Sequence, residues 1–300
     1  MGHKPSGCFP SPAMNRKKQS SESNSSSKSD DSQGVSNTES SKERRRRKWG
    51  NYIPERRKFD PRVPYIIRPR CTALLDPRPM LQWNEVAQTS GYIVSLSRAE
   101  QCLWEIETEA TQIEYPGEPA LMPKTNYTLL VQTDAGTFSN QDKPLDSIPF
   151  NLLSEAERQQ VEAEVQQVQA VQTGEAQMLA VAEIYTKHRL RAEAIDLLEL
   201  AVTQGNRRMV IYQTLGEFYM DVGLHLNAGA PYKQAIKLAK NAGNIEAQAF
   251  LAARLGKVYV VSDDRREALY WFNQAKYGYE GLGHMDAVEG LENAIAELIQ

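Results

Sequence analysis

The second half of the sequence repeats itself, and this repeat constrains the fold more than any other feature. Tyr185, Tyr219 and Tyr259 are separated by 34 and 40 residues. Three further sets of residues recur with the same separations: Ala194, Ala228 and Ala268; Leu198, Tyr232 and Phe272; and Ala201, Ala235 and Ala275. Periods of this size are typical of stacked helical hairpins, each of which buries its apolar face against its neighbours. We therefore expect an all-helical solenoid over residues 154–300.

A Leu-Gly pair precedes the tyrosine in two of the repeats, at Leu215-Gly216 and Leu255-Gly256, where the first repeat has Val181-Ala182. This pattern resembles the tetratricopeptide repeat. The resemblance implies that a small residue on the first helix of each hairpin lets the second helix approach closely. The sequence departs from the family by lacking the proline that often ends each repeat. Six extra residues, 243–248, are expected to lengthen the helices on either side.

The two ends of the helical region carry helix signals of their own. Ser154 and Glu157 form a capping-box pattern, which predicts a helix start. One helical face then carries Val161, Val165, Val168 and Val171, and a stripe near the C-terminus carries Val288, Leu291, Ile295 and Leu298. A polar face opposite that last stripe, with Glu289, Glu292 and Glu297, suits the terminal cap of a solenoid. We predict a linker helix, three hairpins and a capping helix.

Residues 61–153 read as short strands separated by turns that are rich in Pro, Gly and Asp. The expected strands are 65–67, 80–83, 92–96, 103–106, 112–115, 127–131 and 148–152. Seven short strands over about 90 residues are typical of a β-sandwich. The expected fold class is therefore an immunoglobulin-like β-sandwich followed by an α-helical solenoid.

Two motifs sharpen this interpretation. Trp83 stands in an early strand, and Leu121, Pro123 and Tyr127 precede another. The second motif resembles the tyrosine corner of fibronectin type III modules, in which a tyrosine hydroxyl bonds to nearby backbone. A module of this kind before tetratricopeptide hairpins is similar to uncharacterised cyanobacterial repeat proteins, most closely over residues 72–84. That resemblance brings no known activity.

The charge is divided unevenly along the chain. Residues 1–70 contain 17 Lys and Arg against 7 Asp and Glu, whereas the remainder contains 18 against 31. Residues 1–60 are rich in Ser and charge, and we expect them to be disordered. The basic run comprises Arg44, Arg45, Arg46, Arg47 and Lys48, and then Arg56, Arg57 and Lys58. A basic arm over residues 42–70 could bind nucleic acid, anionic lipid or an acidic protein, or act only as a solvated linker.

The cysteines and the N-terminal residues indicate the cellular compartment in which the protein is expected. Cys8, Cys71 and Cys102 are too few for a disulfide framework, and only Cys71 and Cys102 are candidates to pair. No run of about 18 apolar residues predicts a transmembrane helix. The first residues lack the apolar stretch of a signal peptide. We expect a cytoplasmic protein, although relatives of the cyanobacterial group often bear export signals.

No catalytic constellation stands out in the sequence. His3, His188, His225 and His284 lie apart, and none has a metal-binding spacing. His188 and His225 fall at predicted hairpin turns, where we expect solvated side chains. Nucleotide-binding and hydrolase motifs are absent. We therefore expect no metal, no cofactor and no enzymatic activity; an active site between domains is the alternative, without a titratable cluster to support it.

The tetratricopeptide resemblance implies a concave groove lined by the first helix of each hairpin. The residues at those positions are Leu179, Glu183, Thr186, Lys187, Gln213, Glu217, Met220, Asp221, Ala253, Lys257 and Val260. From these we select Glu183, Lys187, Gln213, Glu217, Met220, Asp221 and Lys257 as partner-binding candidates. The expected function is a non-enzymatic scaffold or adaptor that binds a peptide or helix in this groove. The basic arm, acting on nucleic acid or an anionic surface, is the alternative.

Overall fold

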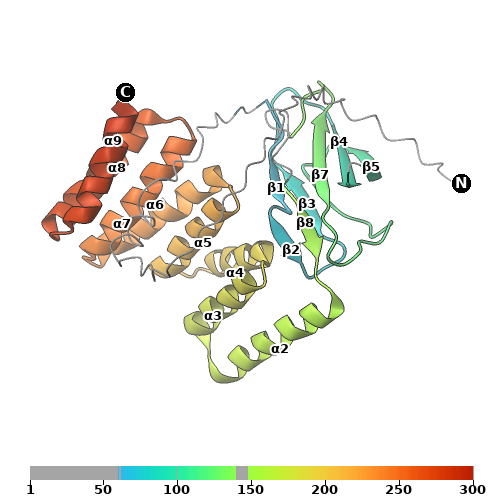
Figure 1. The fold of residues 1–300 in the computed structure, drawn as a ribbon, viewed down its shortest axis with the longest axis horizontal. Helices are drawn as coiled ribbons and strands as arrows, with labels where there is room; N and C mark the ends of the chain where they lie inside the picture. The colour runs from blue at the N-terminus through green and yellow to red at the C-terminus, as the bar shows by residue number, and fades with distance from the viewer. Residues whose placement is uncertain (1–59, 61, 100, 140–147, 300) are drawn as a thin grey trace, which may run out of the picture. The chain divides into compact units, whose positions relative to one another are not determined.

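The computed structural model describes residue 60 and residues 62–99, 101–139 and 148–299. The expected disordered arm and its basic run, up to Lys58, lie outside the described residues. Within the described residues, eight strands are followed by eight helices (Figure 1). A β module followed by a helical repeat region was expected, and this coarse expectation is confirmed.

The strands of the β module are short. They are β1 (Ile66–Arg68), β2 (Thr72–Leu74), β3 (Met80–Trp83), β4 (Tyr92–Arg98), β5 (Gln101–Thr108), β6 (Gln112–Glu114), β7 (Thr128–Thr133) and β8 (Phe150–Leu152). They form a three-stranded sheet in the order β1-β3-β6, a second in the order β5-β4-β7, and a parallel pair of β2 with β8. The two three-stranded sheets are antiparallel, with Leu81 opposite Ile113 and Val94 opposite Val131.

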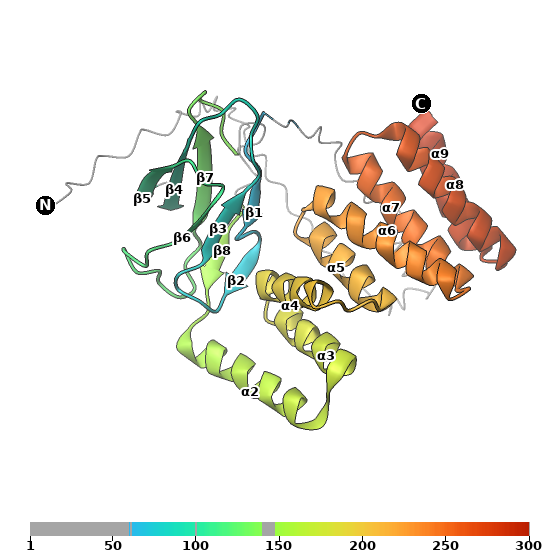
Figure 2. The same ribbon diagram turned by 180° about the vertical axis from the view of Figure 1, so that it is seen from behind.

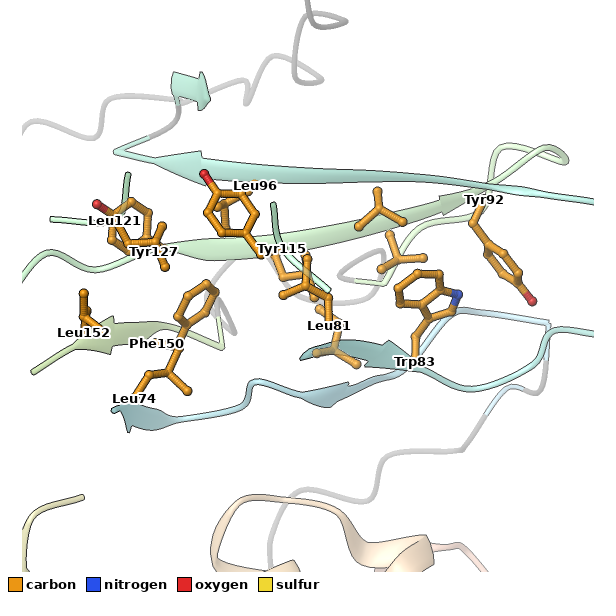
Figure 3. Close-up of a cluster of buried hydrophobic side chains, with 14 of the residues drawn as sticks. Leu74, Leu81, Trp83, Tyr92, Leu96, Tyr115, Leu121, Tyr127, Phe150 and Leu152 are labelled. Carbon is orange, nitrogen blue, oxygen red and sulfur yellow. The ribbon is translucent and has the colours of Figure 1, made fainter. Parts of the chain in front are cut away.

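One apolar core receives side chains from all three sheets. Trp83 and Leu81 of β3 point towards β4, the strand that carries Tyr92 and Leu96 (Figure 3). Along β7, buried and half-buried residues alternate, as expected for a strand with one face on a core. The tyrosine motif also behaves as its pattern suggested, because the Met122 backbone N–H donates to the Tyr127 hydroxyl at 2.7 Å.

Sequence patterns did not predict β2, which has three residues. It is preceded by Cys71, whose backbone has a positive φ of 48°, and it pairs in parallel with β8, far away in the sequence. A strand this short carries almost no periodicity, so its partner rather than its sequence defines it. Cys71 is a free, exposed thiol, so it does not form the candidate pair with Cys102.

The helices follow in an unbroken series. They are α2 (Glu155–Val171), α3 (Gly174–Lys187), α4 (Arg191–Thr203), α5 (Met209–Asp221), α6 (His225–Asn241), α7 (Ile245–Val261), α8 (Arg265–Gly281) and α9 (Met285–Ile299). The first, second and third repeats are α3 with α4, α5 with α6, and α7 with α8; successive hairpins stack side by side in both views (Figure 2).

The helix signals in the sequence correspond to real features. Ser154 caps α2 through the full capping box with Glu157. The extra residues 243–248 lengthen the helices beside them: α6 and α7 each have 17 residues, whereas α5 has 13. On α2 the valine face weakens along the helix, because Val161 is buried while Val171 is exposed.

The repeated alanines and large residues form the solenoid core. Every member of the three recurring sets on the second helices, from Ala194 to Ala275, is at most 3% exposed. On the first helices, Gly216 and Gly256 face the rings of Tyr232 and Phe272. The close approach of paired helices that the Leu-Gly pattern implied is therefore present in the second and third repeats.

Candidate interaction site

The candidate residues of the second repeat lie together on one face of α5. Gln213, Glu217 and Met220 are half-buried, and Asp221 ends the helix with an exposed side chain. The Gln213 amide donates from Nε2 to Glu217 Oε1 at 3.2 Å, as their spacing of four residues allows. Leu215, Gly216 and Tyr219 of the same helix are buried in the solenoid. This face is therefore left over after the helix has packed.

Neighbouring protein atoms partly enclose two charged groups, the half-buried Lys257 amine on α7 and, to a smaller extent, the exposed Asp221 carboxyl on α5. Burial raises the pKa of the Asp221 carboxyl, and the cations of Arg191 and Arg254 offset part of this effect. Burial also lowers the pKa of the Lys257 amine, and the neighbouring Arg254 lowers it further. Among the described residues, neither Asp221 nor Lys257 has a hydrogen bond or ion pair.

Arg254 connects these groups, and sequence reasoning missed it. Its guanidinium lies over the Phe250 ring, 5.0 Å from the centroid, and it acts electrostatically on both Asp221 and Lys257. The signal that could have found it is its place one turn before Lys257 on α7. We call Gln213, Glu217, Met220, Asp221, Arg254 and Lys257 the α5–α7 surface.

Tyr232 lies beneath this surface. Its side chain is buried, and burial raises the pKa of its hydroxyl well above the ordinary value. Arg254 lowers that pKa and the carboxylates of Glu217 and Asp221 raise it, so all three charges act on one ring. The α5–α7 surface therefore carries charges of both signs and is not purely acidic.

The candidate residues of the first repeat do not join this surface in the same way. Lys187 Nζ donates to the Glu164 carboxylate of α2 at 3.0 Å, so it serves the contact between α2 and α3. Glu183 is exposed on α3 without an ion pair among the described residues. Leu179 is partly buried against the solenoid core, which also removes it from the groove positions.

Two groove positions on α7 were assigned wrongly. Ala253 and Val260 are buried in the core that the third repeat shares with α9. A capping helix packs against the last hairpin and needs an apolar surface there. Lys257, half-buried between them in sequence, is thus the α7 candidate that remains on the surface.

The expectation of two solvated histidines at hairpin turns is wrong. His188 Nε2 lies 3.1 Å from Glu164 Oε2, and the histidine side chain is only 13% exposed. His225 is half-buried, with Nδ1 3.4 Å from Met220 Sδ. A turn between two packed helices lies close to neighbouring elements, and this gives both histidines partners.

The basic arm was expected to extend to residue 70, but its last two arginines are occupied within the protein. Arg68 pairs with Asp196 and with Glu199, the latter at 2.7 Å. Arg70 donates from Nε to the Val222 carbonyl. These two side chains belong to the contact between the β module and the helices rather than to a surface for an anionic partner.

The described residues contain no group of three or more His, Cys, Asp or Glu side chains arranged to hold a metal ion. In the same part of the chain, every helix is too short or too polar to cross a membrane.

No family model matches the chain, and no curated protein matches it. Solved structures do resemble it. BtubC from P. vanneervenii is 18% identical with a TM-score of 0.39, over 48% of this chain and 66% of BtubC. MamA is 17% identical with a TM-score of 0.33, over 46% of this chain and 84% of MamA. MamA MSR-1 C2 is 18% identical with a TM-score of 0.31, over 48% and 92%. At these identities and TM-scores the likenesses carry no argument about partners or activity.

Proposed function

We propose that this protein is a non-enzymatic interaction module whose α5–α7 surface binds a peptide or helix of a partner protein. The observation that carries the proposal is Lys257, a half-buried amine on α7 that has no ionic partner among the described residues and lies near the likewise unpaired, exposed Asp221 of α5. Structural charges are normally paired when their contact with water is reduced. A partner that brings opposite charges to these groups would relieve that cost.

The chemistry of the surface describes the ligand. A lysine or arginine of the partner would approach Glu217 and Asp221, which lie one helical turn apart on α5. A carboxylate would approach Arg254 and Lys257 on α7. Between them, the flexible thioether of Met220 offers an adaptable apolar contact. The surface therefore suits a segment with both signs of charge around an apolar residue.

The test reverses the acidic half of the surface in the full-length chain. Glu217→Lys with Asp221→Lys should keep the helical circular dichroism spectrum and the thermal midpoint, but it should lose the partner that the wild type recovers in a pull-down. The matched control, Glu289→Lys with Glu297→Lys, reverses two exposed carboxylates on α9 and should retain that partner. Binding of the recovered protein is then measured by calorimetry with each variant. Equal affinity for wild type and the α5 double variant would remove the α5–α7 surface from the binding site.

A second candidate function rests on the charge asymmetry. Residues 1–70 carry 17 basic against 7 acidic residues, ahead of an acidic remainder. Such an arm would attract nucleic acid or anionic lipid by releasing counterions. Fluorescence anisotropy with a single-stranded oligonucleotide, and sedimentation with phosphatidylserine vesicles, test the two ligands. Binding that disappears without residues 1–60, and that falls steeply with salt, supports this function; no binding at low salt excludes it.

We further propose that the β module is a fibronectin type III-like sandwich that presents the helical region. The bond from the Met122 N–H to the Tyr127 hydroxyl supports this, because it matches the tyrosine corner. The buried Trp83, packed edge-on against Tyr92, adds to it. An experimental structure in which the two three-stranded sheets do not face each other would rule it out.

A further inference from the structure

The short strand β2 lies directly against α4 and the turn before it. The Ala73 N–H donates to the Arg189 carbonyl at 2.9 Å. The Ala192 N–H donates to Thr72 Oγ1 at 3.2 Å. Ala73 is also buried in one cluster with Val161 of α2 and Leu190. We call this contact between β2 and α4 the junction.

Glu193, in the first turn of α4, lies inside the junction. Its Oε1 accepts a hydrogen bond from the Leu75 N–H at 3.0 Å. Its Oε2 is buried and has no hydrogen-bond partner among the described residues. A buried carboxylate oxygen without a donor is costly when ionised, and protonation removes most of that cost. The junction therefore contains one group whose charge opposes its closure.

The surroundings of Glu193 leave this penalty largely uncompensated. Burial raises the pKa of the Glu193 carboxyl to about 7, against opposing effects of the Leu75 N–H, its own backbone N–H and the cation of Arg68. Asp76, just after β2, raises it further. From α3, Tyr185 faces the same carboxyl: the pKa of its hydroxyl is raised by burial and by the Glu193 charge.

We propose that the junction is a proton-controlled latch, closed most firmly when Glu193 is protonated and loosened when it ionises. An open junction would return Glu193 to water, where its pKa takes the ordinary value of 4.5. Between 4.5 and about 7, the closed state thus binds a proton that the open state releases. Rising pH through this interval favours opening, by up to about 300-fold in the opening equilibrium. Above about pH 7, Glu193 is ionised in both the closed and the open state, and a further rise in pH does not change the opening equilibrium.

The latch has a direct connection to the α5–α7 surface. Arg191, two residues before Glu193, donates to the Cys71 carbonyl at 3.2 Å across the junction. The same guanidinium lowers the pKa of Asp221. Opening the junction would free Arg191 to move relative to Asp221. The latch depends only on contacts within the junction, so its test does not require that the α5–α7 surface binds a partner.

Hydrogen exchange of the full-length protein tests the latch at single amides. The reporters are the Leu75 and Ala73 N–H groups, which bond across the junction. Their protection factors, corrected for the intrinsic pH dependence of exchange, should fall between about pH 5 and about pH 8. In Glu193→Gln, which keeps an oxygen acceptor but cannot ionise, the fall should disappear, with protection at the higher pH rising towards the low-pH value of the wild type. Glu183→Gln, an exposed carboxylate of α3, should behave as the wild type.

A carbon-13 NMR titration of the Glu193 carboxyl gives a second reading that needs no variant. A midpoint close to 7 supports the latch, and one near 4.5 overturns it. The latch is equally overturned if wild-type protection at Leu75 is constant with pH, or if Glu193→Gln shows the same fall as the wild type.

Discussion

A side chain on Gly216 would place its Cβ 2.7 Å from the ring of Tyr232, and one on Gly256 would come closer still to Phe272. In the first repeat the equivalent positions hold Ala182 and Leu198, both buried. An aromatic ring on the second helix is thus matched by glycine on the first, and the smaller leucine by alanine. At interior packing density, the two positions share one volume.

Gly216→Ala and Gly256→Ala should each destabilise the protein. The new methyl group has to displace a buried ring, which costs about 1–3 kcal/mol in the free energy of unfolding. Thermal or urea unfolding of the full-length chain measures it.

Gly290 provides the control. It also lies inside a helix, α9, but a Cβ there would meet nothing within 4 Å. Gly290→Ala should therefore stabilise the protein by about 0.5–1 kcal/mol through helix propensity. If Gly216→Ala stabilised the protein as well, the shared-volume explanation would be wrong.

The repeat made the solenoid core predictable from sequence. Ala228, Tyr232 and Ala235 recur in phase because each hairpin buries the same positions against its neighbours, and periodicity records this directly. The capping box at Ser154 was equally predictable from the sequence, because it depends on two residues that are three positions apart. Local and periodic contacts leave a pattern in one sequence.

Contacts between distant segments left no such pattern. The residues around Glu193 in the sequence do not indicate that its carboxylate accepts a hydrogen bond from the Leu75 N–H. The pairing of Arg68 with Glu199 likewise joins two distant elements, β1 and α4. The same holds for the α5–α7 surface: helical spacing predicted that Gln213, Glu217 and Met220 share one face of α5, but no local pattern predicted that Arg254 of α7 acts on Asp221. The ion pair of Lys187 with Glu164 left no local pattern either, because Glu164 lies on a different helix.

Arg68→Ala should weaken the contact between the β module and the helices. Its guanidinium, 21% exposed, bonds to Asp196 and Glu199, and Glu199 also accepts from the Tyr219 hydroxyl. Losing a partly buried, charge-assisted network should cost about 1–3 kcal/mol. Urea unfolding measures the effect.

Arg62→Ala is the matched control, because Arg62 also pairs with a carboxylate, Asp60, but is 79% exposed. Exposed pairs contribute little to stability, so this variant should have the same unfolding midpoint as the wild type within error. Equal losses for the two variants would contradict a role for Arg68 at the contact.

Tyr127→Phe should destabilise the β module. The Tyr127 hydroxyl accepts a hydrogen bond from the Met122 N–H, and the Tyr127 side chain is 1% exposed. Phenylalanine would fill the same space but leave that N–H without its acceptor, at a cost of about 1–3 kcal/mol. Tyr277→Phe removes a hydroxyl from a side chain that is 64% exposed and should be neutral. Urea unfolding of the two variants decides; equal stability would mean that the Tyr127 bond contributes nothing.

The contact between α2 and α3 should weaken in acid. Hydrogen bonds from Lys187, Gln160 and His188 hold the pKa of the Glu164 carboxyl at about 2, below its ordinary 4.5. A lowered pKa means that the Glu164 carboxyl is protonated at a lower pH in the folded protein than in the unfolded chain. The stabilisation by Glu164 is therefore complete above pH 4.5 and is lost as the pH falls towards 2.

Glu164→Gln isolates this effect, because glutamine keeps the shape of the side chain and removes its charge. The wild type should have the higher thermal midpoint at about pH 6, and the difference should shrink steadily between about pH 5 and about pH 2. Glu162→Gln, an exposed neighbour on α2 without an ion pair among the described residues, should match the wild type across that range. A difference for Glu164→Gln that stays constant with pH would show that the ionised carboxylate is not what joins α2 to Lys187 and His188.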